Sequence, residues 1–168
     1  MRIISVIFLT VFFSLAAAAQ QNLQVGQAAP DFAAQTLDGQ TVNLKNLQGK
    51  VVVLTFWSTR CAICHSEIPK LNQVVERYKG QDVVFLALTM ENEAKVNPYL
   101  KKNPFNYTIL TNGFGVVLKY ANMTKDGAIA MGFPSYFLIS KQGTIGLKAE
   151  GWDKAQNVDS QISRLLSE

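Results

Sequence analysis

The sequence predicts an α/β fold in which helices cover a mixed β-sheet. Residues 51–56 and 83–88 are continuous apolar runs, the composition of strands that are buried on both faces of a sheet. Between them, apolar residues from Leu71 to Tyr78 recur at helical spacing. Because strands that alternate with helices form layered domains, and because about 150 residues suit a single core, we expect one domain.

The first half of the chain is expected to contain a hairpin, a strand and a helix. Residues 33–37 and 41–44 flank Asp38-Gly39, a turn sequence typical of a β-hairpin. The strand at 51–56 follows, and the helix after it is expected to end near Gly80, since glycine commonly follows the last turn of a helix.

The second half continues the alternation. After the strand at 83–88 we expect, in order, a helix at 93–102 with a kink at Pro98, a short strand at 107–110, a helix at 115–120, and a hairpin of residues 135–139 and 144–149. Asp153 is predicted to cap a last amphipathic helix, with Gln156 in the capping-box position.

The first 19 residues have the features of a secretory signal peptide. Arg2 supplies a positive charge, residues 3–15 are almost wholly apolar, and residues 17–19 are alanines that suit cleavage. We therefore expect residues 1–19 to be removed and residues 20–168 to form the mature domain, in the periplasm or outside the cell. An uncleaved segment would be a membrane anchor, because the apolar run approaches the about 20 residues that a span requires.

The charge pattern gives no support to nucleic-acid binding. The formal net charge is +4, and no block of basic residues occurs. Cys61, Cys64 and His65 would leave a tetrahedral zinc shell one ligand short, and the chain has no other cysteine or histidine. We therefore expect neither a metal nor a bound cofactor.

The stretch Cys61-Ala62-Ile63-Cys64-His65 allows two kinds of chemistry. It matches the C-x-x-C-H string that attaches haem, and its cysteines alone match a dithiol redox site. A cytochrome c requires a helical fold with a haem cleft, whereas this pair follows a buried strand and opens a helix. A structural disulfide across two residues would close too small a loop to stabilise the fold much. Redox chemistry is therefore favoured.

The predicted position of the cysteines suits thiol–disulfide exchange. At a helix N-terminus, free N–H groups and the helix dipole stabilise the Cys61 thiolate, which is the attacking species. Cys64 lies one turn later, where it can attack a mixed disulfide and release the substrate. Arg60 adds a positive charge beside Cys61, and His65 adds a partial one.

Several motifs resemble one family. Phe56-Trp57, Cys61, Cys64 and Pro69 have the order and spacing of a thioredoxin-fold active site with its kinked first helix. The other matching motifs are Gly132-Phe133-Pro134-Ser135, Ala29-Pro30-Asp31-Phe32, Leu37-Asp38-Gly39, Leu47-x-Gly49-Lys50 and Glu67. Together they resemble the TlpA/ResA-like and AhpC/TSA-type branch of the thioredoxin superfamily, and the stretch after Glu91 fits its αβ insertion.

The resemblance implies a thioredoxin-like fold: a central mixed sheet flanked by helices, with an N-terminal β-hairpin and a central αβ insertion. It also implies an exported thiol–disulfide oxidoreductase that works as a reductant, with Cys61 as nucleophile and Cys64 as resolving thiol. Pro134 is expected to be cis, Phe133 to face the disulfide, and Trp57 to pack beneath it. The implied partners are client proteins with cysteines or disulfides, such as apocytochrome c, and a membrane electron donor.

Three positions depart from the family pattern. Arg60 stands where most relatives carry tryptophan or another uncharged residue, and Thr55 stands where thioredoxin has a buried aspartate. Glu91 or Glu93, in the insertion, is the expected replacement for that carboxylate; a solvated loop glutamate is the alternative. Residues 122–131 form a longer loop than the family pattern leads us to expect, and its apolar side chains suit either the core or a client-binding surface.

Other functions remain as alternatives. An AhpC/TSA-type peroxidase shares the N-terminal motifs, but peroxiredoxins resemble one another in a P-x-x-x-T-x-x-C string, and no proline lies between Pro30 and Pro69. A copper-delivery protein of the SCO-like kind carries C-x-x-x-C and a distant histidine, neither of which occurs here. The non-enzymatic alternative is a redox-inert binding module with a spectator disulfide.

Overall fold

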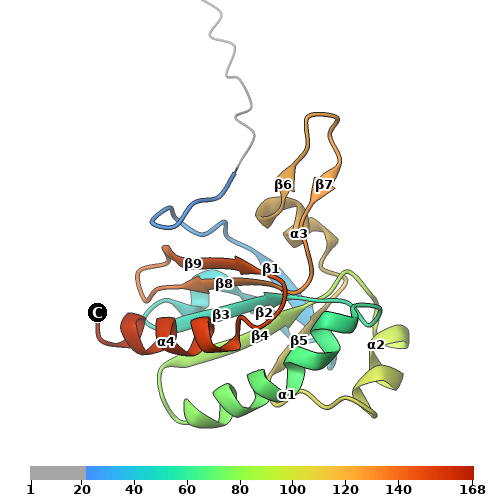
Figure 1. Ribbon diagram of the computed structural model, residues 1–168, viewed down its shortest axis with the longest axis horizontal. Coiled ribbons are helices and arrows are strands. Elements are labelled where there is room, and N and C mark those ends of the chain that lie inside the picture. Colours follow the sequence, from blue (N-terminus) through green and yellow to red (C-terminus); the bar gives the residue numbers. More distant parts are fainter. Residues whose placement is uncertain (1–21) are drawn as a thin grey trace, which may run out of the picture.

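The computed structural model describes residues 22–168, and the signal peptide expected at residues 1–19 lies outside them. The described residues form a seven-stranded sheet with helices on both faces (Figure 1). In sheet order, the strands are β2 (Thr41–Asn43), β1 (Ala33–Thr36), β5 (Thr108–Thr111), β4 (Val83–Leu88), β3 (Val51–Phe56), β8 (Ser135–Ile139) and β9 (Ile145–Glu150). The expected mixed sheet is confirmed, because β3, β4 and β5 are parallel while the other neighbours are antiparallel.

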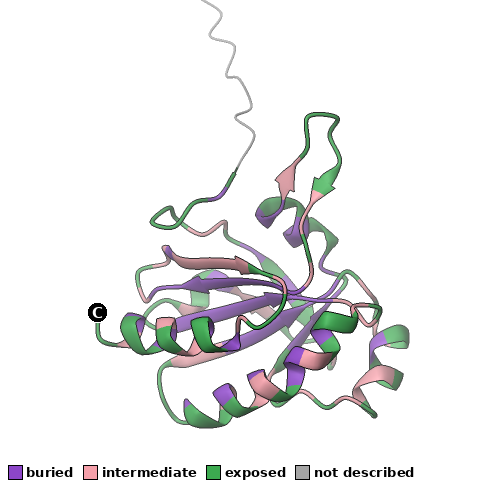
Figure 2. Cartoon of the chain, viewed as in Figure 1, coloured by how far each residue is buried: buried purple, intermediate pink, exposed green. Residues whose placement is uncertain are grey.

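The alternation of side chains along β3 separates two apolar layers. Its even-numbered residues pack on one face together with α3 (Phe114–Tyr120). Val51 and Val53 point to the other face, where α1 (Ala62–Arg77) and α4 (Ala155–Leu166) cover them. All six residues of β3 are buried, so this strand lies at the centre of the core (Figure 2).

The N-terminal hairpin forms as expected. β1 and β2 pair antiparallel, and Gly39 in their turn has a φ of 81°, a conformation that glycine adopts without steric cost. A short 3₁₀ helix, η1 (Leu44–Leu47), then leads into β3. The second expected hairpin is also present, since β8 and β9 pair antiparallel at the opposite edge of the sheet.

The αβ insertion consists of α2 (Glu93–Leu100) and β5. Asn92 caps α2, because its side-chain oxygen accepts a hydrogen bond of 3.2 Å from the backbone N–H of Lys95. On α2, Val96 is fully buried in an apolar cluster that also contains Trp57 and Cys64. The insertion therefore supports the region in which the two cysteines lie.

The expectation that Asp153 caps the last helix is wrong. α4 begins at Ala155 after Lys154, and no side chain caps its first turn. Asp153 has a left-handed φ of 58°, and its carboxylate accepts a hydrogen bond of 3.0 Å from Lys70 Nζ on α1. Asp153 therefore links two parts of the chain instead of capping the start of α4. The inward-facing residues expected on α4 are buried: Ala155, Val158, Ile162 and Leu165.

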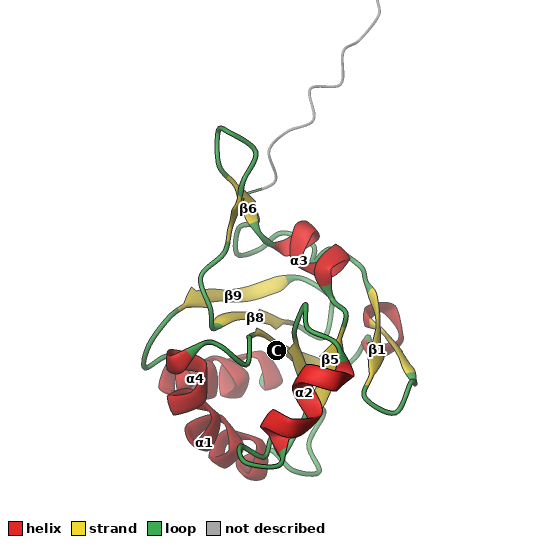
Figure 3. Cartoon of the chain, turned by 90° about the vertical axis from the view of Figure 1, so that its right-hand side faces the viewer, coloured by secondary structure: helices red, strands yellow, loops and turns green. Residues whose placement is uncertain are grey.

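The long segment after α3 contains a separate two-stranded sheet. β6 (Asn122–Met123) and β7 (Ile129–Ala130) form a hairpin that projects from the body of the protein (Figures 1 and 3). Ile129 is 39% exposed, whereas Met131 packs partly against the core, so the segment serves both surface and core. Among residues 22–168, no helix combines the length and apolarity that a membrane crossing requires.

Candidate functional site

The two cysteines lie where the chain leaves β3 and enters α1. Cys61 is the N-cap residue of α1, and its Sγ accepts a hydrogen bond of 3.1 Å from the backbone N–H of Cys64. The pair forms a disulfide, with Cα atoms 5.2 Å apart. Cys61 is partly exposed while Cys64 is only 3% exposed, so an approaching protein reaches the Cys61 sulfur first.

A second segment of the chain, at the start of β8, completes the site. The Phe133–Pro134 peptide bond is cis, as expected, and the Phe133 carbonyl oxygen lies 3.4 Å from Cys61 Sγ. Antiparallel pairing of Phe56 with Ser135 brings this segment to the end of β3 from which the cysteines follow. The sheet register therefore places residues 72 positions apart in the sequence beside each other.

Trp57 lies beneath this site, as expected. It is 1% exposed, and its ring centroid lies 4.7 Å from that of Phe105 and 5.5 Å from that of Tyr99. Both neighbours belong to the αβ insertion, so Trp57 joins the insertion to the loop that carries Cys61.

Glu91 holds the loop in front of Cys61. Its carboxylate accepts hydrogen bonds from the Thr59 backbone N–H, at 2.7 Å, and from the Thr59 hydroxyl, at 2.8 Å. Partial burial would raise the pKa of Glu91, but these bonds, a bond from Thr89 and the charge of Lys95 together lower it. Glu93 bonds instead with Thr111, the last residue of β5, and with Asn112, which follows it. Of the two expected carboxylates, only Glu91 contacts the Cys61 loop.

The two cationic candidates near Cys61 differ in their contacts. Arg60 is exposed, and its guanidinium forms no ion pair with any side chain of residues 22–168. His65 is also exposed, and its Nδ1 lies 3.3 Å from the Tyr99 hydroxyl. Arg60 therefore has no carboxylate partner among the described residues, whereas His65 contacts the insertion through Tyr99.

The sequence did not predict that Glu67 is a buried side chain of the redox site. It is 1% exposed, its Oε1 accepts a hydrogen bond of 3.0 Å from Lys70 Nζ, and its Oε2 accepts one of 3.3 Å from the Lys154 backbone N–H. It lies on α1 three residues after Cys64, and residues at this spacing share one face of a helix. That spacing is the sequence signal that could have identified it as a buried carboxylate.

Glu67 and Cys64 line the same small cavity, of about 10 Å³. Thr55 of β3 and Pro134 also line it, so the strand position that carries aspartate in thioredoxin faces the same space. Tyr107 and Tyr136 also line it, and burial raises the pKa of each phenol. Both tyrosines therefore stay protonated, and Glu67 is the carboxylate of this cavity.

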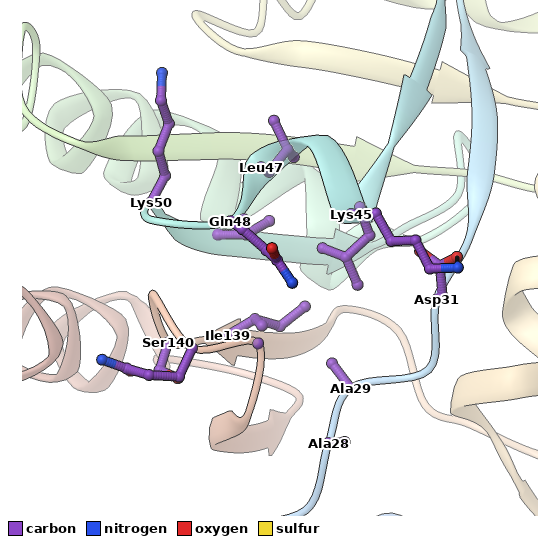
Figure 4. A pocket seen from close by; sticks show the side chains of 13 residues that line it. Ala28, Ala29, Asp31, Lys45, Leu47, Gln48, Lys50, Ile139 and Ser140 are labelled. Carbon is purple, nitrogen blue, oxygen red and sulfur yellow. Dashed lines mark ion pairs between the residues drawn. The ribbon is translucent and has the colours of Figure 1, made fainter.

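A larger cavity, of about 240 Å³, lies at the opposite end of the sheet (Figure 4). Val52 near the start of β3 and Ile139 at the end of β8 line it, together with Leu47 and Lys50. None of the candidate redox residues contributes to it. Within residues 22–168, no cluster of three or more His, Cys, Asp or Glu side chains is arranged to hold a metal ion.

Comparison with known proteins gives matches over most of the chain. The model of the AhpC/TSA family matches residues 25–148. A thiol-disulfide oxidoreductase ResA from Bacillus cereus is 28% identical over 149 residues, which cover 87% of this chain and 81% of that protein. ResA of Geobacillus kaustophilus is 31% identical over 142 residues, covering 84% of this chain and 78% of the relative.

Solved structures agree in fold. A Bacteroides thetaiotaomicron protein, provisionally described as a protein disulfide isomerase, superimposes with a TM-score of 0.75 at 25% identity, covering 88% of this chain and 92% of that one. A Chlorobium tepidum protein, provisionally described as the thiol:disulfide interchange protein DsbE, gives a TM-score of 0.70 at 26% identity, with coverages of 86% and 99%. Both likenesses match the mixed sheet and flanking helices described above.

Proposed function

We propose that the Cys61–Cys64 pair of this protein reduces disulfides in exported client proteins. The chain belongs to the AhpC/TSA family and is a TlpA/ResA-like thioredoxin-fold protein. The family resemblance seen in the sequence is confirmed, and the chain is a thiol–disulfide oxidoreductase. The observation that carries the proposal is the asymmetry of the pair: a partly exposed Cys61 at a helix N-terminus, with a buried Cys64 behind it.

The proposed reaction has two exchange steps. In the dithiol form, the Cys61 thiolate attacks one sulfur of the client disulfide, and the other client sulfur leaves as a thiolate. Cys64 then attacks the Cys61 sulfur of the mixed disulfide, and the second client thiolate leaves. The client is reduced by two electrons, and the Cys61–Cys64 pair is oxidised to the disulfide.

The second step requires a base, because a buried thiol must lose its proton before it attacks. Glu67 is our candidate, since it shares a cavity of about 10 Å³ with Cys64. Glu91 has a different proposed role: its bonds to Thr59 position the loop before Cys61. This replaces the expectation that a carboxylate of the insertion serves the pair directly.

Clients are proposed to bind beside the cis proline. An extended client segment could pair with the backbone at Phe133, whose carbonyl already lies 3.4 Å from Cys61 Sγ. Clients would be exported proteins with cysteines or disulfides, apocytochrome c among them. Export is supported by the leader at residues 1–19.

The direction of electron flow follows from opposing influences on the Cys61 thiolate. The helix N-terminus and Arg60 stabilise it and make the disulfide more oxidising. The uncharged Ala62-Ile63 spacer offsets this effect. We expect a potential between those of thioredoxin and protein disulfide isomerase, about −270 to −180 mV. In an oxidising compartment such a pair works as a reductant only if a membrane donor keeps reducing it.

The test is reduction of a disulfide-bonded peptide by the purified dithiol form. Wild type should reduce one peptide disulfide per protein and become oxidised, Cys61→Ser should be inactive, and Cys64→Ser should stop at the mixed disulfide. Equilibration with glutathione buffers measures the potential, and a value near −120 mV would reverse the assigned direction. Faster reaction with hydrogen peroxide than with any peptide would favour a peroxidase instead, and covalent haem absorbance in the purified protein would overturn the redox assignment.

A further inference from the structure

The turn between β9 and α4 carries a large apolar side chain at the surface. Trp152 is 57% exposed, in a turn that Figure 1 shows between the end of β9 and the start of α4. Single exposed apolar residues are common on proteins and need no function. Trp152 differs from such residues in its position in the fold and in its contacts with charged neighbours.

Backbone contacts tie this turn to the redox site on two sides. The Gly151 N–H donates a hydrogen bond of 2.8 Å to the carbonyl oxygen of Pro134, the cis proline that follows Phe133. On the other side, the Lys154 N–H donates to Glu67 on α1. Trp152 lies between these two attachments, one residue from the contact with the cis-proline segment whose Phe133 carbonyl faces Cys61 Sγ.

Lys70 contacts the exposed ring. Its Nζ lies 5.1 Å from the centroid of the Trp152 ring, a cation–π contact, and 3.0 Å from both Asp153 Oδ1 and Glu67 Oε1. Because Glu67 is buried in α1, Lys70 is anchored, and an anchored cation restricts the movement of the ring above it. A side chain that is ordered before binding loses less entropy when a partner arrives.

We propose that Trp152 is a specificity-determining residue, which binds an apolar or aromatic side chain of the client close to its reacting cysteine, and that Lys70 positions it. This inference rests on the proposed function. The occupant is an extended client segment that continues from the Phe133 backbone across the turn. Two further apolar side chains are accessible next to the redox pair in the chain or in contact with it: Ile63, between the two cysteines, is 37% exposed, and Phe133, whose carbonyl lies 3.4 Å from Cys61 Sγ, is partly exposed. An aromatic client side chain could stack on the indole, whereas a serine would gain little there.

The test uses peptides joined to glutathione through one cysteine. In a glycine–serine background, a single phenylalanine is moved through the four positions on each side of that cysteine, and an all-serine peptide is the reference. Single-turnover reactions of the dithiol protein over a range of peptide concentrations give the half-saturation concentration and the maximal rate. For wild type, we expect phenylalanine at one or two positions to lower the half-saturation concentration about five- to tenfold, with the maximal rate unchanged.

Three variants separate the role of Trp152 from general effects on the fold. Trp152→Ala should lose the preference for phenylalanine while keeping the maximal rate, and Trp152→Phe should keep most of it. Asp153→Asn, which retains a residue suited to a left-handed backbone but weakens the hold on Lys70, should give an intermediate preference. Leu118→Ala, on the exposed side of α3, is the matched control and should behave as wild type.

Two results would overturn the inference. One is that wild type reduces all peptides with the same half-saturation concentration; the other is that Trp152→Ala keeps the full preference. In both cases the proposed function would stand, because the peptides are reduced. Failure of wild type to reduce any peptide would overturn the proposed function, and this inference with it.

Discussion

The hydrogen bonds between Glu91 and Thr59 offer a sharp test of how the Cys61 loop is held. Glu91→Gln keeps the shape of the side chain but removes its charge. If the glutamine carbonyl accepts the bond from the Thr59 N–H, its NH₂ group faces the Thr59 hydroxyl, which must then rotate to accept a bond instead of donating one, and both bonds lose the carboxylate charge. Since a hydrogen bond to a charged group contributes about 1.5–3 kcal/mol and a neutral one about 1, we expect a loss of about 1–2 kcal/mol in the free energy of unfolding. The midpoint of thermal unfolding should fall by about 2–8 °C.

The pH dependence of this loss has a definite sign. The pKa of Glu91 is lowered in the folded protein, because the bonds from Thr59 and Thr89 and the charge of Lys95 outweigh burial, which alone would raise it. Its contribution is therefore fully present above the unfolded pKa and disappears as the pH falls through the folded pKa. Wild type and Glu91→Gln should differ most above about pH 5 and converge in acid, where wild type carries a neutral side chain too.

Denaturant unfolding of both proteins between acid and neutral pH measures this difference. The same samples, reduced, give the alkylation rate of Cys61, which should change in Glu91→Gln because the loop before it is released. Glu93→Gln is the control: the pKa of Glu93 is also lowered, first by the Thr111 hydroxyl, yet it does not contact the loop. It should leave Cys61 alkylation unchanged. A stability difference that stays constant in acid, or equal alkylation effects in both variants, would refute the role given to Glu91.

Three further outcomes are expected. In the reduced protein, iodoacetamide should label Cys61 before Cys64, which is only 3% exposed, and equal rates at neutral pH would contradict the assigned roles. Arg60→Ala should raise the pKa of the Cys61 thiol and slow its alkylation about two- to fourfold at low salt. High salt should screen the charge of Arg60, so the two proteins should then be alkylated at the same rate. A thiolate titration that is the same in both proteins would mean that Arg60 points away from Cys61. Gly113→Ala should destabilise the protein by about 1–3 kcal/mol, since its Cβ would lie 2.6 Å from Leu88 Cγ in the core, whereas Gly115→Ala, with open space around it, serves as the tolerant control.

Most of the sheet could be predicted because its signals are local. The β3 and β4 runs are apolar without interruption, and each strand occupies the residues that the pattern indicated. The β6–β7 hairpin escaped prediction because each strand has two residues, too few to show an alternating pattern. Asp153 was misplaced for a different reason: its partner, Lys70, lies 83 positions away, while the capping pattern concerns only neighbouring residues.

The position of Glu67 could not be predicted by comparing this sequence with thioredoxin one position at a time. Thr55 replaces an acidic residue on β3, and by sequence this leaves the redox pair without a carboxylate unless the insertion supplies one. In the folded chain, a strand and a helix meet at one cavity, so Thr55 from β3 and Glu67 from α1 line the same space beside Cys64. A carboxylate group can therefore be kept in the cavity while the element that carries it changes. Lys70 Nζ and the Lys154 N–H donate to the two oxygens of Glu67, and these bonds allow the side chain to be only 1% exposed, although glutamates are rarely buried so fully.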